Sequence, residues 1–329
     1  MLRHSVRSTS LLFGIVAVLG AALVAAQSPI AAMYGDDQLR NKALTLGFVT
    51  GEIPATAGVS FPAAVYLTQG DLQRAFDESR FRPGGAIVPT NTDLQLTASS
   101  PATQRVLIDR VQKAPAAMKA LQDQADARRS SSGARSQSGL LEIGVDTFAA
   151  RLPAGTAAAT TAFPQNLCLI ATDFANGGAI DRRELFGQDR VRKGISACLT
   201  ALDAAGVQSL VVPLVGAASS GTQSQDPQYE GQRVLMECRL INAIAGIALG
   251  IHDFAPSRRS VREIGIIQWE QEILGMFGAT RGAPMSRTAQ SAYRTYANQV
   301  KLALRNGLAG KKTSASDVSG NCGAILNPS

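Results

Sequence analysis

The sequence predicts an α/β fold: a three-layer α/β/α sandwich with one mixed, largely parallel sheet and an added C-terminal helix. Three apolar segments indicate this, at 64–72, 86–92 and 209–221, and each ends in small or polar residues. Uncharged, β-branched runs of this kind are typical of strands buried on both faces. Helical patterns separate them, and strands that alternate with helices build a parallel or mixed sheet covered by helices.

The elements follow from the spacing of apolar residues. Strands are expected at 64–68, 86–88, 140–148, 166–171, 210–215 and 262–269. Helices are expected near 72–79, from Ser100-Pro101 to about 121 with a break or kink at Pro115, at 191–202, at 232–249 and from Ser286 to 308. The helix at 232–249 is apolar nearly all round, which predicts burial. The Ser/Gly/Arg-rich stretch 128–139 is expected to be a surface loop.

The N-terminus has the pattern of an export signal. Arg3 and Arg7 precede an uncharged run, 11–26, that ends in small residues. The run is short for a membrane span of about 20 residues, so a cleaved signal is favoured over an anchor. We therefore expect an exported, periplasmic or secreted protein, or one anchored in the membrane if the segment is retained. The expected organisation is a signal peptide at 1–26, an irregular lead-in at 27–58, the α/β/α domain at 59–277, a helical extension at 278–309 and a disordered tail at 310–329.

Charge and aromatic content bear on the partner. The chain has 32 basic and 25 acidic residues, a formal charge of +7, and its basic clusters are expected to lie on solvated surfaces. Aromatic residues make up only 5% and do not interleave with the basic ones, so a nucleic-acid partner is not indicated. The protein partner, if there is one, is left open.

Histidine and cysteine limit the possible chemistry. His4 and His252 are the two histidines, and His4 lies in the signal, so a histidine-rich metal site is excluded. The sequence indicates neither a metal nor a cofactor. His252 is expected to cap the end of a helix, where the negative pole favours it. Burial as small apolar side chains is expected for Cys168, Cys198 and Cys238, although disulfides are permitted outside the cytoplasm.

The loops after the apolar strands indicate a ligand. In α/β sheets, ligands bind at the carboxyl ends of the strands. The Gly/Ser loop at 216–221 offers backbone N–H groups without bulky side chains, and a helix start follows it. These features favour a ligand that contains phosphate.

The order of these elements resembles that of a macro domain, an ADP-ribose-binding α/β/α module, from about residue 59 to 277. The resemblance rests on four features: Gly70-Asp71-Leu72, Ala86-Ile87-Val88, the strand, loop and helix at 209–240, and the strand at 262–269. It implies that Asp71 accepts a hydrogen bond from the adenine amino group and that Leu72 offers its backbone N–H to the same ring. The alternative for Asp71 is to cap the helix that follows it.

The resemblance also implies a phosphate-binding loop and a ribose contact. The loop would use Gly216, Ala217, Ser219, Ser220 and Gly221, with Ala218 in place of a middle glycine. The alternative is a tight turn without a ligand. Asn91 stands one residue before the position of the family's distal-ribose asparagine, so it serves only if the loop shifts.

Two departures bear on catalysis and on the cleft. The glycine-rich first phosphate loop of the family is missing, because residues 97–101 read Thr-Ala-Ser-Ser-Pro, so ordinary hydrolase activity is not expected. The stretch 173–183 could line the cleft instead, with Arg182 or Arg183 near a phosphate, although solvated arginines on an ordinary turn are the simpler interpretation. The leading hypothesis is an exported protein that binds an ADP-ribose-type or other nucleotide. The alternatives are a cell-envelope scaffold that has lost the ligand and a hydrolase of ADP-ribose derivatives.

Overall fold

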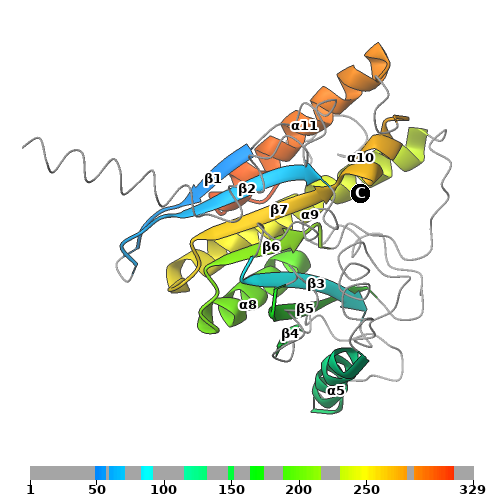
Figure 1. Ribbon diagram of the computed structural model, residues 1–329. Coiled ribbons are helices and arrows are strands. Elements are labelled where there is room, and N and C mark those ends of the chain that lie inside the picture. The colour runs from blue at the N-terminus through cyan, green and yellow to red at the C-terminus, as the bar shows by residue number, and fades with distance from the viewer. Residues whose placement is uncertain are drawn as a thin grey trace, which may run out of the picture.

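The computed structural model describes nine stretches of the chain: residues 49–56, 59–70, 83–91, 115–131, 147–151, 164–173, 188–215, 230–279 and 285–314. Within them the chain forms one seven-stranded sheet with the order β1-β2-β7-β6-β3-β5-β4 (Figure 1). The strands are β1 (Val49–Ile53), β2 (Ala63–Gly70), β3 (Gly85–Asn91), β4 (Thr147–Arg151), β5 (Asn166–Asp173), β6 (Ser209–Pro213) and β7 (Glu263–Trp269).

The sheet is mixed and largely parallel, as the sequence predicts. The five inner strands, β2, β7, β6, β3 and β5, are parallel to one another, and the edge strands β1 and β4 are antiparallel to their neighbours. β6 is buried along its whole length, which is why its sequence is a continuous apolar run without alternation.

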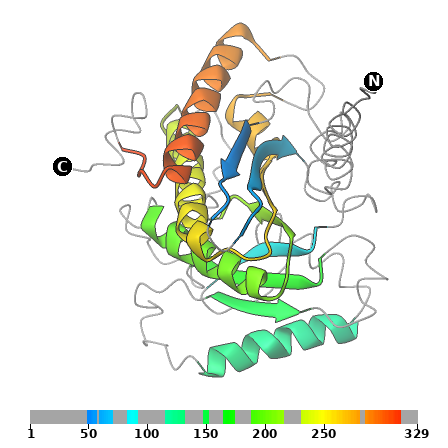
Figure 2. The same ribbon diagram turned by 90° about the vertical axis from the view of Figure 1, so that its left-hand side faces the viewer.

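Helices α8 (Gln188–Ala204), α9 (Glu230–Phe254) and α11 (Arg287–Leu308) lie side by side on one face of the sheet (Figure 2). α5 (Pro115–Ser131) contacts the edge strand β4, and α10 (Glu270–Met276) follows β7 directly. The helix expected near 72–79 and residues 100–114 of the next one lie outside the described residues. The described residues thus form an α/β sandwich of the predicted class, in which α8, α9 and α11 make up one helical layer.

Helix α9 is the core helix. Residues 240–251 are all buried, as its all-round apolar pattern predicts. By length and composition, the segment 237–257 is the one stretch among the described residues that could cross a membrane, and 83% of its most apolar window is buried inside the fold. This burial is what a central helix between two helices and a sheet requires.

Two glycines allow α8 to approach α9 closely. A Cβ atom at Gly246 would lie 2.7 Å from the Cβ of Val191, and one at Gly250 would lie 2.7 Å from the carbonyl oxygen of Arg192. The same helices are joined at their exposed side by the paired Arg192 and Asp253, in which Arg192 Nη2 donates to Asp253 Oδ1 over 2.8 Å. This hydrogen bond raises the pKa of Arg192.

A buried polar network closes the edge of the sheet where the parallel strands begin. The carboxylate of Asp203, 4% exposed, accepts hydrogen bonds from three consecutive backbone N–H groups, those of residues 259–261, over 2.7–2.8 Å. Arg258, 2% exposed, donates to the carbonyl oxygens of Val261 and Phe61 over 2.8 and 2.7 Å. Burial lowers the pKa of Arg258, and the nearby charge of Asp203 opposes this. The network fixes the connection between α9 and β7.

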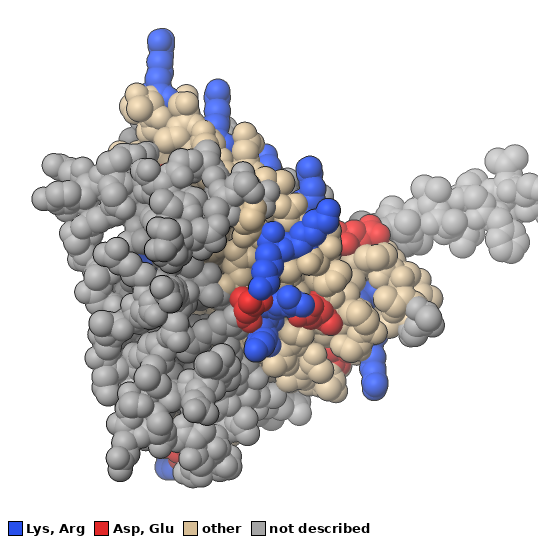
Figure 3. Space-filling view, turned by 180° about the vertical axis from the view of Figure 1, so that it is seen from behind, with Lys and Arg blue, Asp and Glu red and all other residues tan. Residues whose placement is uncertain are grey.

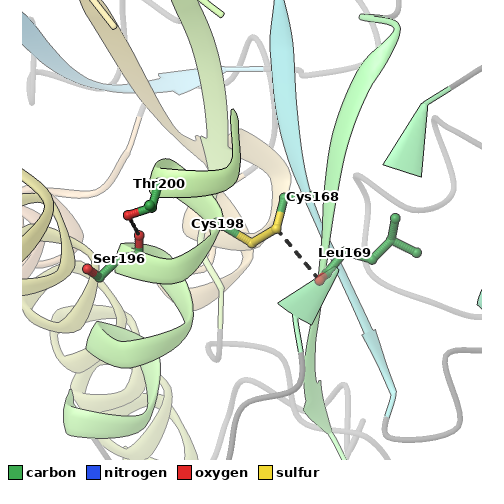
Figure 4. Close-up of a disulfide and its surroundings, with 5 residues drawn as sticks. All are labelled: Cys168, Leu169, Ser196, Cys198 and Thr200. Carbon is green, nitrogen blue, oxygen red and sulfur yellow. Dashed lines mark hydrogen bonds between the residues drawn. A yellow bond between two sulfur atoms is a disulfide. The ribbon is translucent and has the colours of Figure 1, made fainter. Parts of the chain in front are cut away.

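The cysteines correct the sequence interpretation. Cys168 of β5 and Cys198 of α8 form a disulfide with their Cα atoms 5.5 Å apart, so they are not merely packed in the core (Figure 4). Cys238 of α9 is disulfide-bonded too. Burial of Cys168 and Cys198 was predicted correctly, but a sequence does not show that a strand and the helix above it bring two sulfur atoms together.

Three segments also differ from the expectation. The lead-in expected to be irregular contains β1, which pairs with β2 from Val49 opposite Leu67 to Ile53 opposite Ala63. α5 begins at Pro115, the predicted break, and continues to Ser131 into the stretch expected to be a loop. The tail begins in an ordered way, because the backbone of Thr313 exchanges hydrogen bonds with the side chain of Gln188 and Lys312 pairs with Asp189. Residues 315–329 lie outside the described residues.

Candidate functional site

The five parallel strands share one register, which relates the loops at their carboxyl ends. Tyr66 of β2, Gly265 of β7, Val211 of β6, Ala86 of β3 and Leu167 of β5 form a single row of paired residues across the sheet. All five strands leave this row in the same direction. Their carboxyl ends therefore meet along one edge, which we call the carboxyl edge.

Three of the predicted site residues stand at the same distance along the chain from this row. Asp71, Asn91 and Gly216 are each the fifth residue after their own member of it. β2 and β6 are separated only by β7, and β6 and β3 are neighbours. The register thus directs β2, β3 and β6 toward one edge of the sheet, and the three predicted segments continue from these strands, although positions 71 to 216 span 145 residues of the sequence.

Most of the predicted binding residues themselves lie outside the described residues. Asp71 and Leu72 follow Gly70, the last residue of β2, and the loop residues Gly216, Ala217, Ser219, Ser220 and Gly221 follow Val215. The alternative lining at 173–183 is described only at Asp173. The structure describes the end of the strand that precedes each segment, and this end fixes where the segment begins.

The Gly/Ser loop is preceded by a tight turn. The backbone N–H of Val215 donates to the carbonyl oxygen of Pro213 over 2.8 Å, which closes a three-residue turn directly after β6. Val215 is fully buried. The expected strand 210–215 therefore ends two residues early, and the chain has already turned before Gly216.

Asn91 lies at an irregularity in the sheet. Thr90 pairs with Ala171, but Asn91 pairs with Asp173, so the register shifts by one residue between them. The extra residue is in β5 and not in the loop after β3. Bulges of this kind redirect strand ends and are frequent beside binding sites. The bulge places Asp173 of β5 opposite Asn91, so an acidic residue stands at the carboxyl edge, and the loop shift that Asn91 requires stays a prediction.

Sequence reasoning predicted where β7 ends but did not include this end in the candidate site. Trp269 pairs with Gly70 and is the last residue of the strand between β2 and β6. Before it, Gln268 is fully buried, and its side-chain oxygen accepts a hydrogen bond from the hydroxyl of Tyr296 on α11 over 2.8 Å. The signal in the sequence was available: Trp269 is the single tryptophan of the chain, and it ends a predicted strand.

The helices contribute their positive ends to the carboxyl edge. α8 and α9 follow β5 and β6, so each of them begins on the side of this edge, and the short helix α10 starts directly after β7. The first backbone N–H groups of a helix lack partners within it and favour an anion. The edge is therefore suited to a negatively charged ligand.

His252 lies at the opposite edge. It is exposed in the last turn of α9, and its Nδ1 is 3.1 Å from the carbonyl oxygen of Leu308 at the end of α11. A groove of about 440 Å³ lies here, between β1 with the residues that follow it, the ends of α9 and α11, and η1 (Ala255–Ser257). It is lined by Glu52, Ile53, Pro54, Thr56, Ile251, His252, Ala255, Pro256 and Leu308. The prediction that His252 terminates a helix is confirmed, and His252 is remote from the carboxyl edge.

The part of the chain that the structure describes contains no group of three or more His, Cys, Asp or Glu side chains able to hold a metal ion. Nor does any described histidine face a serine or cysteine at the carboxyl edge. The described part of the edge consists of strand and helix ends, with Asn91 and Asp173 among its residues.

Comparison with known proteins leaves the family unassigned. No family model matches the chain, and no curated protein matches it. Among solved structures, a mutant of the Oceanobacillus iheyensis macrodomain is similar, with 10% identity, a TM-score of 0.41 and coverage of 78% of this chain and 99% of that one. The same macrodomain with ADP has 9% identity and a TM-score of 0.38, covering 79% of this chain and 98% of that one. The Thermosipho africanus DarTG in complex with ADP-ribose has 14% identity and a TM-score of 0.36, covering 66% of this chain and 43% of that one. TM-scores below 0.5 assign neither a family nor a function to the chain.

Proposed function

We propose that this protein binds an ADP-ribose-type or other nucleotide ligand at the carboxyl edge of the sheet. The observation that carries the proposal is the shared register, in which Asp71, Asn91 and Gly216 each stand fifth after one row of paired residues. The adenine would lie at Asp71 and the backbone N–H of Leu72, and the phosphates on the loop 216–221.

The spacing of the strands agrees with such a ligand. Neighbouring strands lie about 4.8 Å apart, so the ends of β2 and β6 are separated by about 10 Å across the end of β7. A nucleotide bridges this span when its base lies at one strand end and its phosphates lie at the other. Asn91, at the end of the strand next to β6, would then face the sugar beyond the phosphates.

The proposed activity is binding without ordinary hydrolysis. The one histidine outside the N-terminal segment, His252, lies at the opposite edge of the sheet and contacts the end of α11. The sequence also lacks the glycine-rich first phosphate loop. These observations supply no histidine to act as general base for the attack of water at the carboxyl edge.

We further propose that the protein functions outside the cytoplasm. The basic and apolar N-terminal pattern supports export, and the disulfide between Cys168 and Cys198 supports an oxidising compartment. The alternative function, an envelope scaffold without a ligand, is favoured by the same location, because ADP-ribose is mainly an intracellular compound.

Calorimetric titration of the protein with ADP-ribose, ATP and AMP separates these functions. The proposal predicts saturable binding of at least one of the three with a stoichiometry of one. Release of free ribose or of a phosphate during the titration, measured by chromatography, would instead favour the hydrolase. The absence of measurable binding for all three nucleotides would overturn the proposal and favour the scaffold.

A further inference from the structure

The outer face of α11 concentrates the positive charge of the molecule. Residues 285–314 contain six Lys or Arg and no Asp or Glu, whereas the whole chain has an excess of seven positive charges. Figure 3 shows Lys and Arg side chains projecting in a row across this side of the molecule. Charge of one sign over such a length is not what a merely solvated helix needs, since opposite charges four residues apart would stabilise it.

The basic residues of α11 fall on a single line. Arg287, Arg294 and Lys301 are seven residues apart, and Arg305 follows four residues later. Successive steps of seven and four residues return a helix to nearly the same face. We call these four residues the basic stripe. It extends over about 27 Å, at 1.5 Å per residue.

The basic stripe points away from the core. The buried residues of α11 lie on the other side, facing α9 and the sheet: Tyr293, Tyr296, Ala297, Gln299, Val300, Ala303, Leu304 and Gly307. Arg287, Arg294 and Arg305 are exposed, and Lys301 is half-buried. Between them the line holds only the exposed, uncharged Ser291 and Asn298. Within the described part of the chain, no acidic side chain forms an ion pair with the stripe.

We propose that the basic stripe docks the protein on a membrane surface that contains anionic phospholipid. A row of cations along the exposed side of a helix matches a flat layer of phosphate head groups. The stripe carries no aromatic or large apolar side chain, so it would lie on the head groups without insertion. Single-stranded nucleic acid is disfavoured because no aromatic side chain interrupts the row to stack on a base.

The N-terminus provides an independent argument for a membrane as the partner. Arg3, Arg7 and the apolar run 11–26 would direct the chain to a membrane, whether the segment is cleaved or retained. A basic surface that faces the same membrane afterwards would hold the protein there. The N-terminal segment and the basic stripe thus both favour a membrane as the partner.

Co-sedimentation of the full chain with phosphatidylcholine vesicles, with and without phosphatidylglycerol, tests the proposal. The N-terminal segment with Arg3 and Arg7 is the same in every variant, so the comparison between variants isolates the contribution of the basic stripe. The triple variant R287Q/R294Q/R305Q should lose on the order of a hundredfold in preference for phosphatidylglycerol, from about fivefold per basic residue. The matched variant K119Q/K193Q/R259Q removes three exposed charges elsewhere and should bind like the wild type. The variant R287K/R294K/R305K keeps the charge and should also bind.

Two results would overturn the proposal. One is an equal preference for phosphatidylglycerol in the wild type, the stripe variant and the matched control. The other is release of the wild type from vesicles by duplex DNA at an equal concentration of phosphate, which would make nucleic acid the preferred partner. Because the three arginines are exposed, all variants should keep the thermal midpoint of the wild type, and this is measured alongside.

Discussion

Ala86 of β3 lies opposite Val211 of β6 in a parallel ladder, and this pairing fixes the relation between two loops. Asn91 ends β3 five residues later, and Gly216 follows Val211 at the same spacing, beyond the end of β6 and outside the described residues. Ala86 and Val211 are more than a hundred positions apart in the sequence, and only the order of the strands makes them neighbours. The candidate site therefore depends on topology as much as on the residues in it.

Asp71→Ala tests the adenine assignment. If the carboxylate accepts a hydrogen bond from the adenine amino group, its removal should weaken the binding of adenine nucleotides by about 1.5–3 kcal/mol. The binding of a ligand without adenine, such as inosine diphosphate, should change little. Titration calorimetry measures both. Equal losses for the two ligands would mean that Asp71 only caps its helix.

The disulfide between β5 and α8 should contribute substantially to stability. Replacement of Cys168 and Cys198 by alanine should lower the free energy of unfolding by about 2–4 kcal/mol, because the bond closes a loop across 30 residues. Urea unfolding with and without a reductant measures this. Peptide mapping of the oxidised protein should recover Cys168 with Cys198. Free thiols at Cys168 and Cys198 in the purified protein would contradict the account.

Gly250→Ala tests the close contact of α8 and α9. The new methyl group would meet backbone and side-chain atoms of α8 at 2.7 Å, so the thermal midpoint should fall by several degrees. Gly275→Ala in α10 is the matched control, because its methyl group would meet nothing within 4 Å. Alanine is favoured over glycine in a helix by up to about 1 kcal/mol, so this control should be neutral or slightly stabilising. A similar loss in both variants would contradict the packing argument.

Asp203→Ala should destabilise the protein far more than the loss of an exposed carboxylate. Asp203 is buried and accepts three backbone hydrogen bonds, so its removal leaves three donors unsatisfied and should cost roughly 2–4 kcal/mol. Asp189→Ala breaks only the exposed pair with Lys312 and should cost less than about 1 kcal/mol. Urea unfolding of both variants measures the difference. Equal losses of unfolding free energy would show that the buried network around Asp203 contributes no more to stability than an exposed ion pair does.

The sequence predicted the inner strands and the long helices well, because these are buried continuously or on one face. β3, β5, β6 and β7, and the helices α8, α9 and α11, all occur near their expected positions. Ser286 caps α11 by accepting from the backbone N–H of Ala289, at the expected start. β1 was missed because an edge strand of five residues, Val-Thr-Gly-Glu-Ile, has no strong apolar run.

The site was predictable only as separate segments. Local sequence indicates that one strand ends near Thr68 and another near Val215, but not that both ends lie on one edge of the sheet. The bulge at Asn91 was likewise invisible, since the extra residue belongs to β5, which is about 80 positions away in sequence. Pairing across the sheet supplies this information, as it does for Cys168 and Cys198.

The most direct test of the central claim is titration of ADP-ribose into three forms of the protein. The wild type should bind, and Gly221→Glu should abolish binding, because a bulky carboxylate in the proposed phosphate loop both fills the space and repels the ligand. Ala197→Glu adds the same charge at an exposed position of α8 and should bind like the wild type. If Gly221→Glu binds ADP-ribose as tightly as Ala197→Glu does, the nucleotide does not rest on the carboxyl edge, and the account is contradicted.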